Sequence, residues 1–298
     1  MYRGIIITYN PSIEDKKNIA KLVKHKYKLI IIDNGSSGIH GLQDITGFIN
    51  SYNTTFIKLK KNYGLAYAQN RGIKEAENHK AEYIFLLDQD SELPENYFND
   101  MISFYKGHSY DYKIGMVVPN FFDPNIRQYT RYAKLTRFFY KHISCENNEF
   151  CDVTFAVASG SLIPLKVIQD AGKMREELFI DYLDNEFSMR LHEKGYSTLV
   201  NCSVLMNHTI GKRSCHRIFG LTFKPNHHDA SRKYYIFRNG FILIWEYLWR
   251  YPGFAALIAN RMIGEILGII FFEKDKISKF MSVFRGLKDS FFPVHFNA

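Results

Sequence analysis

Short β-branched runs alternate with helix-like segments along the first part of the chain, and this alternation limits the fold more than any other feature. The apolar runs, which we interpret as strands, occupy residues 5–7, 29–32, 56–59 and 83–87. Helical patterns lie between them at 12–24, opened by the capping residue Ser12, and at 65–78. Apolar strands separated by helices predict a mostly parallel α/β sheet with helices on both faces.

Polar residues follow each predicted strand at the point where it ends. They occupy positions 8–10, 33–36, 62–64 and 88–90. Ligands of parallel sheets bind at the carboxyl ends of the strands. We therefore expect these four groups to meet at one site.

Asp88 and Asp90 form the most informative pair. Two carboxylates this close repel each other, and a cation or a hydrogen-bond donor would offset the repulsion. Oxygen ligands suit a divalent metal, and a diphosphate would complete its coordination shell. The pair taken alone fits equally well two solvated carboxylates that cap a helix beginning near Pro94.

Asp33 and the segment 62–72 carry further polar groups suited to a nucleotide. The Asp33 carboxylate can accept the N3–H of uracil or thymine, or a ribose hydroxyl. Taken alone, it fits better as the start of a turn, which the following Asn-Gly favours. Asn62 and Asn70 offer neutral hydrogen bonds among small residues that allow a ligand to approach closely. The segment lacks the glycine pattern of dinucleotide-binding folds.

Several motifs in this order resemble glycosyltransferase family 2. They read TYNP at 8–11, IDNGS at 32–36, NYG at 62–64, NRGI at 70–73 and LDQD at 87–90. Segments 158–161, 179–190, 207–211 and 234–239 resemble the bacterial rhamnosyltransferase branch of that family. The resemblance implies the Rossmann-like GT-A fold, inverting transfer and a nucleotide-diphosphate sugar as the donor.

The resemblance also implies which residues bind the donor. The nucleotide base and ribose would contact the first strand ends, with Asp33 at the pyrimidine ring, and the diphosphate would lie along the third and fourth. Arg238 or Arg232 would assist the leaving diphosphate. The implied substrate-binding residues are Thr8, Asn10, Asp33, Asn62, Gly64, Asn70, Asp88, Gln89, Asp181 and Arg238.

A metal site and a general base complete the implied set. Asp90 and His208 would hold Mg²⁺ or Mn²⁺. Asp184 would take the proton of the acceptor hydroxyl, although Leu183 replaces the acidic neighbour that the family often has there. Asp181 is a second candidate for the base, and we interpret it rather as a ligand of a sugar hydroxyl. Glu186 and Arg190, spaced four apart, predict a structural ion pair.

The chain divides, by composition, into a GT-A domain at 1–220 and a helical region at 221–298. The domain would comprise a nucleotide-binding half at about 1–118 and an acceptor-binding half at about 119–220, with a basic insertion on the rim at 120–152. Basic and aromatic residues interleave in the last helices. That pattern fits contact with the inner leaflet of a membrane, or packing on the domain or on a second copy in a homo-oligomer.

Charge and cysteine usage set the expected compartment and partners. The net charge of +9 points to an anionic partner, and without a nucleic-acid motif we expect no nucleic acid. Cys145, Cys151, Cys202 and Cys215 show no paired spacing, which predicts reduced thiols. No signal peptide precedes the first strand, and charges interrupt the apolar segment 253–272. We expect a cytoplasmic protein, peripheral on the inner face of the cytoplasmic membrane.

The functional hypothesis is a metal-dependent transferase of L-rhamnose from dTDP-β-L-rhamnose. The acceptor would be a lipid-diphosphate-linked glycan in bacterial surface polysaccharide synthesis. A UDP-hexose-dependent enzyme is the alternative within the family, because uracil and thymine present the same N3–H to Asp33. A non-catalytic nucleotide-sugar-binding or membrane scaffold protein is the alternative of another class.

Overall fold

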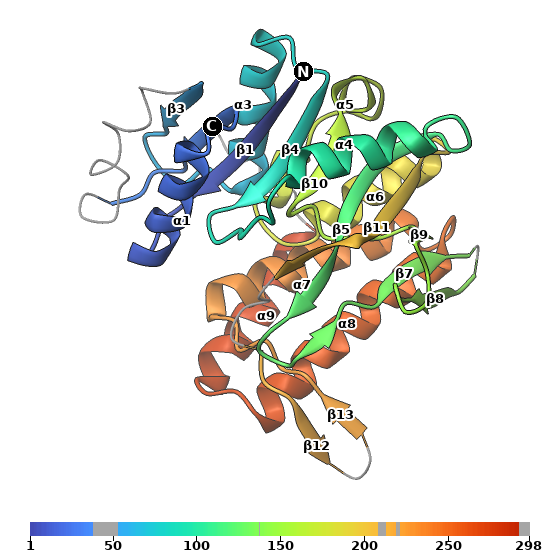
Figure 1. Cartoon of the computed structure of the whole chain (residues 1–298). Coiled ribbons are helices and arrows are strands. Elements are labelled where there is room, and N and C mark those ends of the chain that lie inside the picture. Colours follow the sequence, from blue (N-terminus) through green and yellow to red (C-terminus); the bar gives the residue numbers. More distant parts are fainter. Residues whose placement is uncertain (38–52, 137, 208–212, 219–220, 292–298) are drawn as a thin grey trace.

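The computed structural model describes residues 1–37, 53–136, 138–207, 213–218 and 221–291 (Figure 1). The first half contains β1 (Tyr2–Thr8), α1 (Ile13–Lys24), β2 (Leu29–Asp33), β3 (Thr54–Lys58), α3 (Leu65–Asn78), β4 (Tyr83–Asp88), α4 (Tyr97–His108), β5 (Ile114–Asp123), β6 (Gln128–Tyr129), β7 (Tyr132–Leu135), β8 (Tyr140–Ile143) and β9 (Phe150–Val153). The second half contains β10 (Ser161–Pro164), α5 (Leu165–Ala171), α6 (Leu183–Glu193), β11 (Ser197–Asn207), β12 (His216–Ile218), β13 (Leu221–Phe223), α7 (Ala230–Tyr247), α8 (Pro252–Phe271) and α9 (Lys276–Ser290).

The main sheet runs in the order β3-β2-β1-β4-β10-β5-β11-β9. β1 pairs in parallel with β2 and with β4, and β5 pairs in parallel with β11. β10 and β9 are antiparallel to their neighbours. The predicted mostly parallel α/β sheet is confirmed, with the antiparallel strands β9, β10 and β6 added to it.

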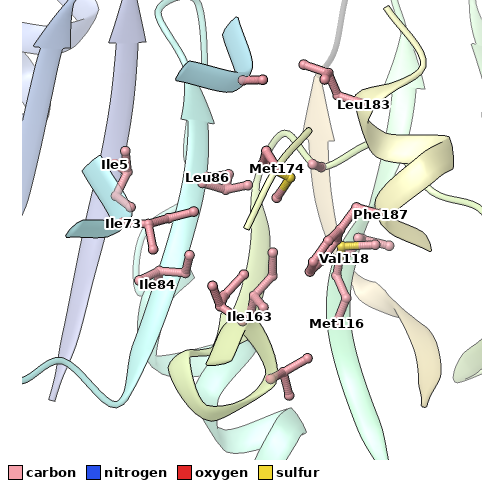
Figure 2. Close-up of a cluster of buried hydrophobic side chains, with 14 of the residues drawn as sticks. Ile5, Ile73, Ile84, Leu86, Met116, Val118, Ile163, Met174, Leu183 and Phe187 are labelled. Atoms are coloured by element: carbon pink, nitrogen blue, oxygen red, sulfur yellow. The ribbon is translucent and has the colours of Figure 1, made fainter. Parts of the chain in front are cut away.

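Helices cover both faces of the sheet because its central strands are apolar on both sides. One face of the sheet is covered by α3 on β1 and β2, by α5 on β10 and by α6 on β11. The opposite face packs against α1 and α4. Figure 2 shows part of the first core, where Ile5, Ile73, Ile84 and Phe187 point into the same layer. The described strands and helices of the first hundred residues lie where the sequence predicts them.

The segment 120–152, predicted as an insertion on the rim, extends β5 and forms short antiparallel strands. β6 pairs with the end of β5, and β7 pairs with β8. Its basic side chains include Lys134, which forms an ion pair with Asp152 at 2.6 Å. Through β7, the segment also shares a hydrophobic core with the C-terminal helices.

The C-terminal helices α7, α8 and α9 share a hydrophobic core with β7 and α6. Within that core Lys233 is fully buried and donates to Glu265 and to Glu273, which also binds Lys279. By length and composition alone, α8 could cross a membrane, and 39% of its most apolar window is buried in the protein. The charged Arg261 and Glu265 of α8 are both paired with residues outside that helix.

The prediction that all four cysteines are reduced thiols is wrong for two of them. Cys145 and Cys202 form a disulfide, with their Cα atoms 5.4 Å apart. The pairing of β9 with β11 brings these residues together across 57 positions of sequence, which spacing alone does not reveal. Cys151 and Cys215 are free thiols.

Candidate active site

A cleft of about 860 Å³ opens at the carboxyl ends of the central strands. β1 lies between β2 and β4, so the chain continues from β1 to β2 on one side and later to β4 on the other side. Open α/β sheets bind ligands at such a point, where the strand order reverses. The register places Ile7 beside Asp88 and Thr8 beside Asp33. Residues after β1, β2 and β4 therefore meet at one edge, as predicted.

The predicted nucleotide-binding residues lie at the ends of β1 and β2. Asp33 is fully buried, and its Oδ1 accepts hydrogen bonds from the backbone and hydroxyl of Ser36. The other oxygen, Oδ2, and the buried Thr8 hydroxyl have no hydrogen-bond partner among the described residues. Asn10, with φ of 46°, accepts from the Ser37 backbone. Thr8 and Asp33 are register partners on β1 and β2, and a polar ligand would supply the missing hydrogen bonds, although neither residue lines the cleft itself.

Asn62 and Gly64 lie at the start of α3 within a small hydrogen-bond network. The Asn62 side chain accepts from Asn34 at 2.9 Å and from the Gly64 backbone at 2.9 Å. Gly64 has φ of 94°, and a Cβ there would come within 2.6 Å of the Phe179 ring. Asn34 lines the cleft and organises this network, a role that the sequence analysis did not assign to it.

Two predicted substrate-binding residues have structural roles instead. Asn70 bonds through both ends of its amide to Met174 and also donates to Glu176, which ties α3 to the segment before α6. Arg238 is 2% exposed and donates to the Glu177 carbonyl. Neither side chain lines the cleft. Each lies on a helix face that contacts another segment of the protein.

The acidic motif after β4 lines the cleft with all three of its side chains. Gln89 accepts from the Tyr9 backbone at 2.9 Å and donates to Asp15 at 3.0 Å, so it links the ends of β4 and β1. Asp88 is half-buried and Asp90 is exposed to the cleft. Carboxylate oxygens of this kind fit Mg²⁺ or Mn²⁺. The other predicted ligand, His208, lies outside the described residues.

Asp184 lies in the first turn of α6, at the wall of the cleft. Its neighbours Leu183 and Phe187 point into the sheet core, which fixes the start of the helix (Figure 2). Asp184 itself lines the cleft. Burial raises the pKa of Asp184 to about 7, and the negative charges of Asp88 and Asp181 add to this, against a backbone hydrogen bond from Ala158. A carboxyl group with such a pKa is suited to accept a proton near neutral pH.

Asp181 also lines the cleft but differs in its electrostatics. Its carboxylate contacts Arg232 at 3.0 Å and Arg261 at 2.9 Å. Burial opposes ionisation, yet the two guanidinium groups hold the pKa of Asp181 below its ordinary value. A carboxylate so paired is a weak base. The predicted Glu186–Arg190 ion pair is confirmed, with a bidentate contact at 2.7 and 2.9 Å.

Arginines from distant segments line the cleft together with the acidic motif. They come from the rim, from the segment before β12, from α7 and from α8, namely Arg131, Arg213, Arg232 and Arg261. From the sequence, Arg232 was a candidate only as an alternative to Arg238, and the other three arginines had no predicted role in the site. No local motif marks them, because only the packing of α7 and α8 beside α6 brings them together.

Comparisons with known proteins agree with this geometry. The sequence profile of "Glycosyl transferase family 2" matches residues 5–172. A "dTDP-rhamnosyl transferase RfbF" of Shigella flexneri is 29% identical over 245 residues, which cover 81% of this chain and 79% of that protein. A "Poly-beta-1,6-N-acetyl-D-glucosamine synthase" of Staphylococcus aureus is 29% identical over 231 residues, 70% of this chain and 50% of that protein.

Solved structures share the fold at low sequence identity. The structure of S. aureus TarS 1–349 with UDP-GlcNAc matches with a TM-score of 0.58 and 16% identity, over 97% of this chain and 80% of that one. GalNAc-T7 with UDP, GalNAc and Mn²⁺ matches with a TM-score of 0.57 and 15% identity, over 80% of this chain and 47% of that one. Because the family profile covers more than half of the chain, the protein belongs to glycosyl transferase family 2 and is a glycosyltransferase.

Proposed function

We propose that the protein transfers L-rhamnose from dTDP-β-L-rhamnose to a glycan acceptor, with inversion at the anomeric carbon. The observation that carries the proposal is one cleft lined by the Asp88–Asp90 motif and by Asp184 with its raised pKa, and by Asn34, which directly follows Asp33. The similarity to a dTDP-rhamnosyl transferase over most of both chains supports rhamnose as the sugar.

Asp184 is the proposed general base of this reaction. Its carboxylate takes the proton of the acceptor hydroxyl while the hydroxyl oxygen bonds to the anomeric carbon from the face opposite the leaving diphosphate. The bond from that carbon to the diphosphate oxygen breaks in the same displacement. This geometry converts the β-linked donor into an α-L-linked product.

Asp88 and Asp90 are the proposed residues for Mg²⁺ or Mn²⁺, together with His208. A divalent ion there would neutralise the charge that gathers on the leaving diphosphate. Arg232 lines the same cleft and offers a cationic group there. Asp33 and Thr8 would hydrogen-bond the thymine base and the ribose with the two atoms that have no partner within the described part of the chain.

The donor can be tested by transfer assays with dTDP-β-L-rhamnose and with UDP-hexoses at equal concentration. We expect turnover of the dTDP-sugar and an α-linked product in the nuclear magnetic resonance spectrum. The similarity to a poly-N-acetylglucosamine synthase favours a UDP-sugar as the second candidate. Turnover of UDP-sugars alone would establish that alternative, and donor binding without turnover of either sugar would make the protein a binding module.

For the acceptor we propose a lipid-diphosphate-linked glycan, which would place the protein on the inner face of the cytoplasmic membrane. An exposed apolar stripe on α9 supports this location, since Ile277, Met281 and Phe284 are 80%, 68% and 69% exposed at helical spacing. Arg285 beside the stripe is exposed too. Apolar and basic side chains on one helix suit an anionic leaflet.

Sedimentation with phosphatidylglycerol vesicles tests the location. The double variant Met281→Ser/Phe284→Ser should bind these vesicles less than the wild type. The matched control is Tyr110→Ser, which removes a 95% exposed aromatic residue beyond the end of α4. Equal vesicle binding by all three proteins would contradict the proposal. A concentration-dependent dimer that the double variant loses would assign the stripe to a second copy instead.

A further inference from the structure

The segment that leads into α6 has an unusual backbone. Phe179, Asp181 and Tyr182 have φ values of 62°, 65° and 62°. Residues with a Cβ rarely adopt this left-handed region, because the Cβ comes too close to the following carbonyl oxygen. Three such residues within four positions persist only where surrounding groups hold them. The segment directly precedes α6, so the contacts that hold its backbone also determine where Asp184 lies.

Asn239 of α7 binds the backbone of the segment directly. The side chain is fully buried, and its Nδ2 donates to the carbonyls of Leu178 at 2.7 Å, Ile180 at 2.8 Å and Asp181 at 3.3 Å. One amide group therefore binds three backbone carbonyls in and around the strained residues. Arg238, its neighbour on α7, donates to the preceding carbonyl of Glu177 at 2.8 Å.

Side chains from α7 and α8 hold the segment from the outside. Arg261 of α8 contacts the Asp181 carboxylate at 2.9 Å and lies over the Tyr182 ring, 4.5 Å from its centroid. The Phe179 ring stacks on Tyr235 of α7, with 4.8 Å between the centroids. The ion pair thus holds Asp181, the ring contact holds Phe179, and the amide hydrogen bonds hold the backbone carbonyls of the same segment.

On its inner side the segment touches the predicted donor-binding residues. The Phe179 carbonyl accepts from the Leu65 backbone at 2.7 Å, at the start of α3. Gly64 has room only for a hydrogen where the Phe179 ring approaches. The segment thus connects the C-terminal helices to the Asn62–Gly64 turn on one side and to Asp184 on the other.

We propose that Asn239 and Arg261 are positioning residues of the transfer reaction. They hold the segment 177–182 with Phe179, Asp181 and Tyr182 in the left-handed region, and that conformation places the Asp184 carboxylate in the cleft. The inference rests on the proposed role of Asp184 as the base. It gives the helices α7 and α8 a part in the reaction that is independent of any membrane contact.

Asn239→Leu tests the inference, because leucine has a similar size and no donor. We expect kcat to fall by roughly ten- to a hundredfold, since a small displacement of a catalytic group is enough to do so. The dissociation constant of dTDP, measured by calorimetry with Mg²⁺, should stay within about twofold. Hydrogen exchange of the backbone amides at 178–184 should become faster than in the wild type. The matched control is Asn260→Leu on α8, which removes an amide donor to the Tyr140 hydroxyl outside the cleft and should change none of these values.

Arg261→Lys is the second variant, since it retains the charge near Asp181 but loses the planar guanidinium contact with Tyr182. The inference requires the same pattern in this variant, with a smaller loss of kcat. It is overturned if the variants keep kcat within about twofold, or if dTDP affinity falls in parallel with kcat. If Asp184→Asn retains transfer, the proposed base is wrong, while unchanged hydrogen exchange in both variants would refute the positioning of the segment itself.

Discussion

Asp184 and Asp181 are three residues apart, yet their surroundings give them opposite electrostatic properties. Burial and nearby acids raise the pKa of Asp184 to about 7. The guanidinium groups of Arg232 and Arg261 lower the pKa of Asp181. Sequence alone left both as candidates for the base, because the arginines that separate them lie 48 or more positions away. The structure favours Asp184 for proton transfer and Asp181 for positioning.

The first prediction concerns the pH dependence of activity. A base must be deprotonated to act, so kcat/KM should rise about tenfold per pH unit below pH 7 and level off above it. Initial rates measured between pH 5.5 and 8.5 at constant ionic strength would show this limb. A profile that is flat across this range would contradict the assignment of Asp184.

The second prediction concerns the stability cost of the same residue. Because the pKa of Asp184 in the folded state exceeds the ordinary value of 3.8 for an aspartate, the unfolded chain releases the proton first, and the native state loses stability as pH rises toward 7. Asp184→Asn removes this cost and should raise the free energy of unfolding at pH 8 by roughly 2–4 kcal/mol. Urea titrations would detect the gain, which should be larger at pH 8 than at pH 6. A less stable variant would show that the carboxylate contributes to the fold.

Residues at the ends of strands could be predicted from the sequence more reliably than residues on helices. Asp33, Asp88 and Gln89 lie at the expected edge because strand ends are fixed by apolar runs that are easy to recognise. Arg238 and Asn70 sit on helices whose polar faces turn toward other segments. Which face of a helix meets the ligand depends on long-range packing, which one sequence does not show.

At the scale of elements, the positions of the rim segment and of the C-terminal helices could not be predicted from the sequence. The hairpin of β7 and β8 and the helices α7 to α9 were recognisable as composition, but not as the partners of α6. The disulfide between Cys145 and Cys202 belongs to the same class, since it depends on strand pairing across 57 residues.

The third prediction tests that disulfide. Removing it in the double variant Cys145→Ser/Cys202→Ser should lower the free energy of unfolding under oxidising conditions by roughly 2–4 kcal/mol, because the unfolded chain loses a long cross-link. Thermal or urea unfolding measures the difference. The control Cys215→Ser removes an exposed free thiol and should leave stability unchanged. Identical stability of the double variant and the control would show that the cross-link does not stabilise the native protein.

At the scale of the whole molecule, side chains of both charges line the cleft. The end of β4 contributes Asp88 and Asp90 and the first turn of α1 contributes Asp15, whereas the rim, the segment before β12 and the C-terminal helices contribute arginines. Carboxylates suit a cation with a nucleotide diphosphate, and arginines suit the anionic part of a substrate. Asp184, at the start of α6, lines the same cleft.

The most direct measurement is donor binding and sugar transfer by Asp184→Asn beside the wild type, with dTDP-β-L-rhamnose and Mg²⁺. Asparagine keeps the size of the side chain and removes its ability to accept a proton. We predict an affinity for dTDP within about twofold of the wild type and a loss of transfer of at least a hundredfold. Transfer at the wild-type rate by the substituted protein would contradict a base at this position and with it the proposed reaction.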